Sequence, residues 1–515
     1  MKGWLKISII ATLILIMVLV VNFLFFYNLK ESFEQTDLVP TYRNVNNGGD
    51  QMVYFSMIRQ AMEGKNLLIN LYTSENQVGL ISPLWWLLGK ITAISGLSIP
   101  LVYYIFTIIS AFSLLFFVYY LSKGVFSFLW QQLLSLLLLV FGGGLGIFYI
   151  NRILFPVGGR SLSEEDLFSK IISADLWYGE GFGFLSLRHS PLFILTQLTL
   201  VVLFWWLAEK IKKTNWWQVF LIAIGVFFLV LIHPYDAVPL AGFIFVYGLI
   251  YWRSRDQFDN WLKMVPLGLA TALALIYFFY LKTIDLSFLG WASQNVTRTP
   301  YPLSYLAGYF WLIIPAIYGS VLAFRHKQKR CQWLVIWLLI GAFLIFIPAP
   351  TQRRFASGVY IPMAILAWYG WLNFWQKRNQ VLFFSVTTIY LIIASATFFL
   401  ITALNINVIN NNFQMTKITN AELAGLEFYK NNSDEDDVLL TAYSFGNLVP
   451  AYISRKVYIG HGHQTVNWSI KKQFTDWFYK DNDQEDVKYE QIKKRGINYI
   501  WIDLSKEDYF LKELK

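Results

Sequence analysis

Apolar segments long enough to cross a bilayer alternate with short polar connections along most of the chain. A transmembrane helix needs about 20 predominantly apolar residues, and runs of roughly that length recur between residues 7 and 404. The candidate spans are residues 7–27, 99–121, 126–148, 191–207, 216–232, 237–252, 262–281, 303–324, 332–348, 359–375 and 381–404. The pattern therefore predicts an all-α polytopic membrane bundle with about eleven transmembrane helices.

Basic residues mark every second connection between these spans. Clusters of Lys and Arg occur at residues 209–213, 253–263, 325–330 and 376–378. Short loops rich in Lys and Arg stay in the cytoplasm, so these clusters define one face of the bundle. The N-terminus, with Lys2 and Lys6, is then expected to be cytoplasmic and its helix uncleaved. The chain after residue 404 is expected to be extracytoplasmic, in a multi-pass protein of the cell membrane.

A further apolar stretch, residues 78–97, is predicted not to cross the membrane. If it crossed, every later basic cluster would face outside, against the charge rule. About a dozen apolar residues precede Lys90, a length typical of interfacial segments, and Pro83, Gly89 and Gly96 interrupt the run. Residues 28–98 are therefore expected to form one external loop that contains juxtamembrane helices.

Composition supports the membrane class and excludes several others. The chain has 515 residues, of which 56% are hydrophobic and only 14% charged, and its mean hydropathy is +0.46. The net charge of +10 comes mainly from loops between apolar runs, where membrane orientation explains it, so nucleic-acid binding is not expected. Cys331 is the one cysteine, which excludes an intramolecular disulfide and a cysteine-based metal site.

The tail differs in composition, because its acidic and basic residues nearly balance. Short β-rich runs at 438–441, 456–459 and 499–503 alternate with helical patterns at 421–431, 470–479 and 487–495. The sequence thus predicts a transmembrane domain at 1–404 and a small extracytoplasmic α/β domain at 405–515.

One carboxylate opens the first external loop's helical pattern. Gly48, Gly49 and Asp50 precede residues 51–63, where apolar side chains recur at helical spacing. This predicts an amphipathic helix at the membrane surface with Asp50 at or near its N-cap. A cap with no further role is the alternative interpretation of a lone Asp at this place.

This region resembles the first external loop of GT-C glycosyltransferases. The resemblance rests on the motif 49–54, the run 58–64 and the segments Pro83-Leu84-Trp85 and Leu88-Gly89. These enzymes, of the protein mannosyltransferase and aminoarabinose transferase type (family 39-like), take a sugar from a polyprenyl phosphate carrier. The resemblance implies that Asp50 is the catalytic base, a role worth roughly 10²–10⁴-fold in rate. It also makes Tyr54 and Arg59 candidates for substrate contacts and implies a second juxtamembrane helix before the second span.

The second large outward loop carries further acidic and basic candidates. Asp175 and Glu180 lie among aromatic residues and glycines, and Arg188 and His189 precede the next span. These four are candidate substrate-binding residues. In related transferases an acidic motif of this region binds a divalent cation, but no D-x-D spacing occurs here, so Asp175 and Glu180 are weak metal candidates and the metal stays unknown. The acidic run 164–166 is interpreted as the solvated start of a helix.

His233 and Asp236 fall at the outer end of a span with apolar sequence on both sides. An Asp at such depth costs about 2.5–3.5 kcal/mol unless it faces a cavity or a partner, which favours a substrate-binding role. A tight turn at the interface, where Asp and Pro are ordinary, is an equal alternative.

Arg353 and Arg354 are the exception to the charge rule, because they lie on an outward loop. Arg presents a planar fork that matches phosphate oxygens. The family carries basic residues near the corresponding helix end for the carrier phosphate, so the resemblance implies that this pair binds the donor phosphate. Headgroup anchoring by snorkelling side chains is the alternative.

In the tail, residues 444–452 and 458–465 resemble the exported C-terminal domain of transferases of this type. His461 and His463, spaced by one residue, are candidate substrate-binding residues in a loop over the sugar site, and a turn without function is the alternative. A metal role is weakly supported, because no third ligand is evident nearby.

The resemblance therefore implies a GT-C-type glycosyltransferase. It would move a sugar from a polyprenyl-phosphate-linked donor in the lipid bilayer to a glycan, lipid or protein acceptor at the outer face. A transporter or flippase of a lipid-linked saccharide is the alternative, but no internal repeat of the kind that transporters show is apparent. A structural envelope subunit would have no need for Asp50 or the outward arginines.

Overall fold

The computed structural model describes residues 3–34, 37–149, 171–254, 257–375, 379–411, 416–480 and 485–502. The chain forms two compact units. Unit 1 comprises Met1–Phe26, Tyr104–Ala274 and Thr297–Asn407, and unit 2 comprises Tyr27–Tyr103, Leu275–Val296 and Val408–Lys515. The predicted Lys2, the acidic run 164–166 and the basic cluster 376–378 lie outside the described residues.

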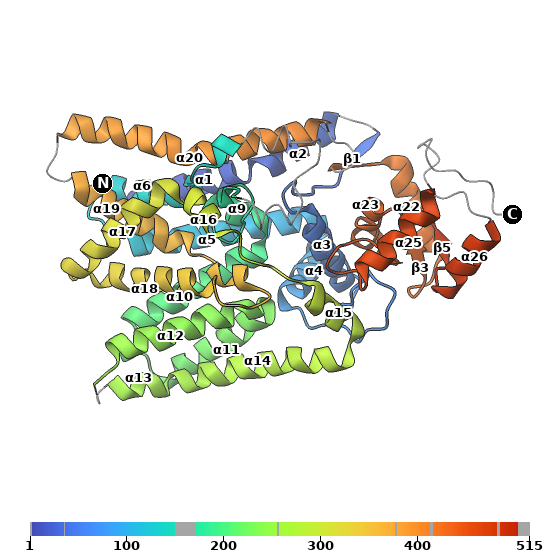
Figure 1. The fold of residues 1–515 in the computed structure, drawn as a ribbon, viewed down its shortest axis with the longest axis horizontal. Helices are drawn as coiled ribbons and strands as arrows, with labels where there is room; N and C mark the ends of the chain where they lie inside the picture. Colours follow the sequence, from blue (N-terminus) through green and yellow to red (C-terminus); the bar gives the residue numbers. More distant parts are fainter. Residues whose placement is uncertain are drawn as a thin grey trace. The chain divides into compact units, whose positions relative to one another are not determined.

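Unit 1 consists of helices along most of its described length (Figure 1). They are α1 (Gly3–Val21), α2 (Phe23–Glu34), α5 (Ile99–Ser122), α6 (Leu129–Phe141), α9 (Gly183–His189), α10 (Pro191–Glu209), α11 (Trp216–Ile232), α12 (Ala237–Tyr251), α13 (Phe258–Leu262), α14 (Met264–Ile284), α16 (Pro302–Gly308), α17 (Phe310–Arg325), α18 (Lys329–Leu344), α19 (Tyr360–Trp375) and α20 (Gln380–Asn411). Short 3-10 turns join several of them, namely η1 (Gly146–Tyr149), η2 (Ala174–Leu176), η3 (Ile211–Lys213), η4 (Pro234–Asp236) and η6 (Gln352–Ala356). The helices α2, α5, α14 and α20 continue along the chain into unit 2.

Among the described residues, seven helices are long and apolar enough to cross a membrane. If α16 and α17, which are bent by 87° at their break, count as one broken span, the number of candidate spans in these residues rises to eight. Helix α11 is a shorter apolar helix. The protein is therefore a multi-pass helical membrane protein. A helix occupies each of the predicted apolar segments, but α18 and α19 have only 16 residues each, so the count of eleven spans stays a prediction.

Burial separates the central helices of unit 1 from its outer ones. Every residue of α19 from Tyr360 to Gly370 is buried, whereas Leu269 and Leu273 of α14 are 61% and 60% exposed. Exposed apolar faces of this kind suit contact with lipid. The helices α17 and α19 lie side by side (Figure 1), because Gly319 and Gly370 let their backbones approach closely.

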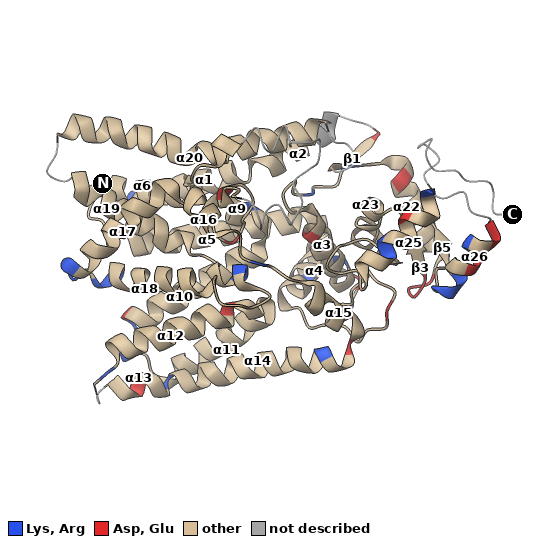
Figure 2. Ribbon diagram, viewed as in Figure 1, with Lys and Arg blue, Asp and Glu red and all other residues tan. Residues whose placement is uncertain are grey.

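The basic connections meet at one end of unit 1. Arg330 forms a bidentate ion pair with Glu209, with N–O distances of 2.7 and 2.6 Å, and the Lys263 ammonium donates to the Ile211 carbonyl at 3.2 Å. Figure 2 shows blue ribbon segments, which mark Lys and Arg, near α13 and the start of α18. Three clusters that the charge rule assigned to one face therefore lie together, and their cytoplasmic orientation stays a prediction.

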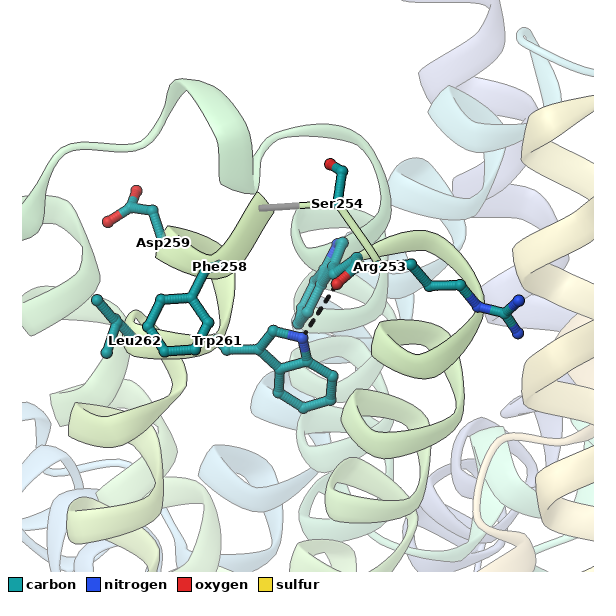
Figure 3. Close-up of a pocket in the computed structure, with 7 residues that line it drawn as sticks. Arg253, Ser254, Phe258, Asp259, Trp261 and Leu262 are labelled. Carbon is teal, nitrogen blue, oxygen red and sulfur yellow. Dashed lines mark hydrogen bonds between the residues drawn. The ribbon is translucent and has the colours of Figure 1, made fainter. Parts of the chain in front are cut away.

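An open hollow of about 780 Å³ lies at this same basic end (Figure 3). Trp252, Arg253, Phe258 and Trp261 line it, and the Trp261 indole N–H donates to the Trp252 carbonyl at 3.3 Å. Its aromatic and basic lining is typical of a membrane–water interface. None of the candidate site residues lines it.

Unit 2 combines residues 27–103 and 275–296 with the tail. Its elements are β1 (Leu38–Pro40), α3 (Gly48–Met62), α4 (Pro83–Ser95), α15 (Leu286–Gln294), β2 (Lys417–Thr419), α22 (Asn420–Asn432), β3 (Val438–Leu440), α23 (Tyr443–Gly446), α24 (Val449–Ile453), β4 (Lys456–Val457), α25 (Trp468–Lys480), α26 (Glu485–Lys494) and β5 (Tyr499–Ile500). Strands β1 and β2 pair antiparallel, and β4-β3-β5 form a parallel sheet. Side chains of the sheet and of α25 and α26 share one apolar core.

The strands and helices predicted for the tail all occur as β3, β4, β5, α22, α25 and α26. The compact unit nevertheless includes residues 27–103 and 275–296 as well as the tail. The predicted boundary, which makes 405–515 a domain by itself, therefore stays a prediction.

The stretch predicted not to cross forms α4, which has 13 residues. At about 1.5 Å per residue it is too short to span a hydrocarbon core of about 30 Å. Helix α4 packs against α3, and Gly89 makes this possible, since a Cβ there would lie 2.4 Å from the Ala61 Cβ. The placement of this pair at the membrane surface stays a prediction.

Candidate active site

Asp50 lies in the first turn of α3, three residues after the N-cap Asn47. The Asn47 side chain makes no capping hydrogen bond, and a negative charge in the first turn is favoured by the helix dipole. The Asp50 side chain is 39% exposed. Asp50 is thus near the N-cap, as the sequence predicted, and its carboxylate is partly exposed.

His461 contacts this carboxylate from the tail of the chain. Its Nε2 lies 3.1 Å from Asp50 Oδ1, and its side chain is 9% exposed. Its Nδ1 accepts the backbone N–H groups of His463 and Gln464, both at 3.2 Å. Because Nδ1 accepts hydrogen bonds, the fitting tautomer carries its proton on Nε2, the nitrogen that lies beside Asp50 Oδ1.

The other candidates in unit 2 make packing contacts. Tyr54 stacks on Trp85, with ring centroids 4.4 Å apart. The Arg59 Nε donates to the Ala451 carbonyl at 2.6 Å, which ties α3 to α24. His463 Nδ1 lies 3.1 Å from the Gln294 carbonyl. Its ring therefore has a different partner from the ring of His461, which lies beside Asp50.

In unit 1 the structure holds Arg353 between an acidic and two aromatic side chains. Its Nε lies 3.5 Å from Glu180 Oε1, and its guanidinium lies 5.5 Å from the Trp177 ring and 5.8 Å from the Tyr178 ring. The Tyr178 hydroxyl donates to the Arg353 carbonyl at 2.6 Å. These contacts fix the 3-10 turn η6 and the direction of its first arginine.

Glu180 is buried, and its environment is positive. Burial opposes its ionisation, but the charges of Arg353, Arg354 and His189 outweigh burial and hold the pKa of Glu180 below its ordinary value of 4.5. The Glu180 carbonyl also accepts the Gly358 N–H at 3.3 Å. The carboxylate is therefore ionised at neutral pH and offsets part of the charge of the two arginines.

Arg354 lies near a second polar pair of unit 1, His233 and Asp236. Its guanidinium lies 5.1 Å from the Tyr235 ring, in the turn η4, which contacts η6. In η4, His233 Nδ1 lies 2.9 Å from Asp236 Oδ2, and both side chains are buried. Within the described ranges, His233 Nε2 and Asp236 Oδ1 have no hydrogen-bond partner, which is costly for buried polar atoms without a role.

His189 completes this cluster of unit 1. Its ring lies edge-to-face on Phe193, with centroids 4.6 Å apart, and Phe193 in turn contacts the His233 ring at 5.4 Å. The structure therefore brings six sequence candidates of unit 1 together: Glu180, His189, His233, Asp236, Arg353 and Arg354. We call this set the arginine cluster.

Two further candidates lie outside the arginine cluster and are engaged in packing. Asp175 is fully buried and accepts the N–H groups of Gly144 at 2.7 Å and Gly146 at 3.4 Å. The Arg188 Nε donates to the Val21 carbonyl at 3.0 Å, and its NH2 donates to Thr402 at 3.1 Å. Burial lowers the pKa of Arg188 to about 10, so it remains charged at neutral pH.

No metal centre is evident in the part of the chain that the structure describes. In those residues, no three His, Cys, Asp or Glu side chains are grouped to hold a metal ion. The oxygens of Asp175 face N–H and hydroxyl donors, which suits a carboxylate held by the fold better than a metal ligand.

Sequence reasoning missed the aromatic residues that carry the arginines. Trp177, Tyr178, Phe193 and Tyr235 place both guanidinium groups through ring contacts. The signal available was the aromatic content of the segments around Glu180 and His233. Aromatic content alone does not identify which rings contact the arginines.

The helical architecture of the chain is similar to that of solved structures of a GT-C class glycosyltransferase. Solved structures of the oligosaccharyltransferase AglB from the archaeon Archaeoglobus fulgidus share it. A complex of AglB with an inhibitory peptide and a dolichol-phosphate has a TM-score of 0.56 at 11% identity and covers 97% of this chain and 69% of that one.

A second AglB structure, tethered to an acceptor peptide that contains the NVT sequon, has a TM-score of 0.55 at 12% identity, with the same coverage. A third, in complex with Zn and sulfate, has a TM-score of 0.53 and covers 95% of this chain and 67% of that one. At these identities the likeness establishes the fold. No protein-family model and no curated protein sequence matches the chain.

Proposed function

We propose that the protein is a GT-C glycosyltransferase that moves a sugar from a polyprenyl-phosphate-linked donor to an acceptor at the outer face of the cell membrane. The observation that carries the proposal is the partly exposed Asp50 carboxylate, oriented in the first turn of α3 and contacted by His461. The fold supports it, since the similar AglB structures include complexes with a dolichol-phosphate and with an acceptor peptide.

In the proposed reaction Asp50 acts as general base. Its carboxylate takes the proton from an acceptor hydroxyl or amine as that atom forms a bond to the anomeric carbon of the sugar. The bond between the anomeric carbon and the phosphate oxygen breaks, and the polyprenyl phosphate leaves with the electron pair. No oxidant, reductant or further reactant is needed.

The arginine cluster is proposed to bind the donor phosphate. Arg353 and Arg354 each present a planar set of N–H donors, and ring contacts hold both guanidinium groups. His189 and His233 add N–H donors beside them, and Glu180 and Asp236 limit the net charge. A phosphate dianion fits such a site better than a neutral sugar does.

The proposed membrane topology follows from the basic clusters on every second connection. The N-terminus faces the cytoplasm, and the tail and the loop 28–98 lie outside, where a glycan, lipid or protein serves as acceptor. A divalent cation is not needed for this proposal, because the arginines supply the positive charge that a leaving phosphate requires.

The experiment that tests the proposal changes Asp50→Asn in the full chain, reconstituted in liposomes. The donors are a panel of polyprenyl-phosphate-linked hexoses and aminosugars, with membrane extract as the source of acceptors. We expect donor binding to persist and release of polyprenyl phosphate to fall about 10²–10⁴-fold. Asp37→Asn, an exposed carboxylate earlier in the same loop, is the matched control and should retain full activity.

The same assay separates the proposed enzyme from a flippase. A flippase would move the labelled donor across the liposome bilayer and form no covalent product. Translocation without product, or full transfer activity in Asp50→Asn, would overturn the transferase proposal.

A further inference from the structure

We propose that His461 is the positioning residue of Asp50: its Nε2–H holds Asp50 Oδ1 in the orientation in which the carboxylate receives the acceptor's proton. The inference rests on the proposed function, and it adds a role for the tail of the chain in that reaction. The contact that carries it is the 3.1 Å distance between Nε2 and Oδ1.

The turn around His461 fixes which ring nitrogen carries the proton. Two backbone N–H groups, those of His463 and Gln464, point at Nδ1 at 3.2 Å. A proton on Nδ1 would face two donors, so the neutral ring carries its proton on Nε2. His461 is therefore a donor toward Asp50 and does not itself act as a second base.

The turn is rigid because several hydrogen bonds close it. The Thr465 hydroxyl accepts the N–H groups of Gly460 and His461, both at 3.2 Å, and donates to the Tyr72 carbonyl at 2.9 Å. Gly460 permits this close packing, since a Cβ there would lie 2.4 Å from the Gly446 carbonyl oxygen. The imidazole is thus held to the first external loop, which also carries Asp50.

Two more side chains fasten the same turn. The Asn70 amide donates to the Gln464 carbonyl at 2.7 Å, and the Gln294 amide donates to the Thr465 carbonyl at 2.9 Å. The ring of His461 also lies against Gly49, at 3.4 Å from the position of a Cβ there. A ring fixed on this many sides transmits its orientation to the flexible carboxylate.

The chemical consequence concerns the turnover step and not donor binding. A hydrogen bond to one oxygen fixes the plane of the carboxylate and thereby the direction of its lone pairs. During transfer the proton goes from the acceptor to Asp50, and the proton on His461 Nε2 stays in place. Loss of the imidazole should therefore lower kcat and leave the KM for the donor unchanged.

The experiment compares His461→Ala with His461→Gln in the reconstituted full chain. Gln keeps an N–H donor and an acceptor at the end of the side chain, so it reproduces the two contacts of the neutral ring. We expect His461→Ala to lower kcat about 10–100-fold, the usual cost of losing a partner that orients a reactive group. His461→Gln should recover most of that loss.

The matched control is Gln464→Ala, which lies on the same turn and keeps the backbone N–H that donates to Nδ1. It should have wild-type kcat and wild-type KM. Thermal melting of each purified variant excludes loss of fold as the cause, and the pair Asp50→Asn, His461→Ala should be no slower than Asp50→Asn alone.

The outcomes separate this inference from the proposed function. If Asp50→Asn is inactive while His461→Ala turns over like the wild type, the positioning role is wrong and the transferase stands. No rescue by His461→Gln, or an additive loss in the double variant, also overturns the positioning role. Full activity of Asp50→Asn overturns the transferase and with it this inference.

Discussion

The Arg353 guanidinium lies 3.5 Å from the buried Glu180 carboxylate, and its Nε makes no hydrogen bond within the described residues. The two groups therefore attract each other without the directional contact that would lock them together. The carboxylate offsets one arginine charge and still leaves N–H donors for another anion. This relationship suits a site that binds and releases a phosphate.

A change of Arg354→Ala should weaken donor binding and leave the turnover of bound donor largely intact. A charge-assisted hydrogen bond to phosphate contributes about 1.5–3 kcal/mol, so we expect the Kd to rise about 10–100-fold. Binding of a polyprenyl-phosphate-linked hexose to the purified protein measures it. Arg298→Ala, at an exposed arginine, is the charge-matched control, and equal Kd values for both variants would contradict the phosphate role.

Glu180 should make the stability of the protein depend on pH. Its pKa in the folded protein lies below its ordinary value of 4.5, because the charges of Arg353 and Arg354 outweigh its burial. Its stabilising contribution is therefore complete above about pH 4.5 and is lost as the pH falls through the lower folded value. Thermal melting between neutral and acidic pH should show this loss in the wild type and a shallower slope in Glu180→Gln.

The control for that slope is Glu435→Gln. The hydrogen bond from Lys65 also holds the pKa of Glu435 below its ordinary value, but the pair is mostly exposed. Exposed ion pairs contribute little to the free energy of unfolding. This variant should therefore keep the wild-type dependence of melting temperature on pH. Equal slopes in the wild type and Glu180→Gln would show that the buried pair does not contribute.

The sequence predicted the positions of the helices well, because lipid contact and burial both require apolar side chains. It did not predict the 87° bend between α16 and α17, since hydropathy carries no information on direction. It predicted spans at 332–348 and 359–375, where α18 and α19 have 16 residues each, and their crossing of the membrane stays a prediction.

The sequence named candidate residues but did not predict the contacts between them. Asp50 and His461 were both candidates, but their pairing depends on a turn that hydrogen bonds to Tyr72 and Thr465 create. The spacing of His461 and His463 suggested a shared ligand, whereas the ring of His463 faces the Gln294 carbonyl. Contacts between distant parts of the chain decide such roles, and periodicity does not report them.

A change of Gly89→Ala should push α3 and α4 apart and lower both stability and activity. A Cβ at Gly89 would lie 2.4 Å from the Ala61 Cβ and 2.6 Å from the Ile58 carbonyl oxygen. Overpacking of this kind costs about 1–3 kcal/mol, and it would displace the helix that carries Asp50. Gly225→Ala in α11, where a Cβ meets nothing within 4 Å, is the control and should be neutral in thermal melting and in transfer assays.

Asp175→Ala should lower stability without affecting metal or donor affinity. The change leaves the buried N–H groups of Gly144 and Gly146 without their acceptor, at a cost of about 1–3 kcal/mol. The control is Asp259→Ala, whose partly exposed pair with Lys263 lies among the basic connections of unit 1. If Mg²⁺ or Mn²⁺ raises the melting temperature of the wild type but not of Asp175→Ala, Asp175 is a metal ligand and the packing role is wrong.

The topology decides whether Asp50 and the arginine cluster are able to serve one donor. In a Cys331→Ser background, single cysteines at Asp37, Arg298, Asp434 and Lys212 are exposed to a membrane-impermeant maleimide in intact cells. The charge rule predicts labelling at the first three positions, and at Lys212 only after permeabilisation. Labelling of Arg298→Cys and Asp37→Cys from opposite sides would place the proposed base and the proposed phosphate site across the bilayer from each other, and no single donor headgroup reaches both.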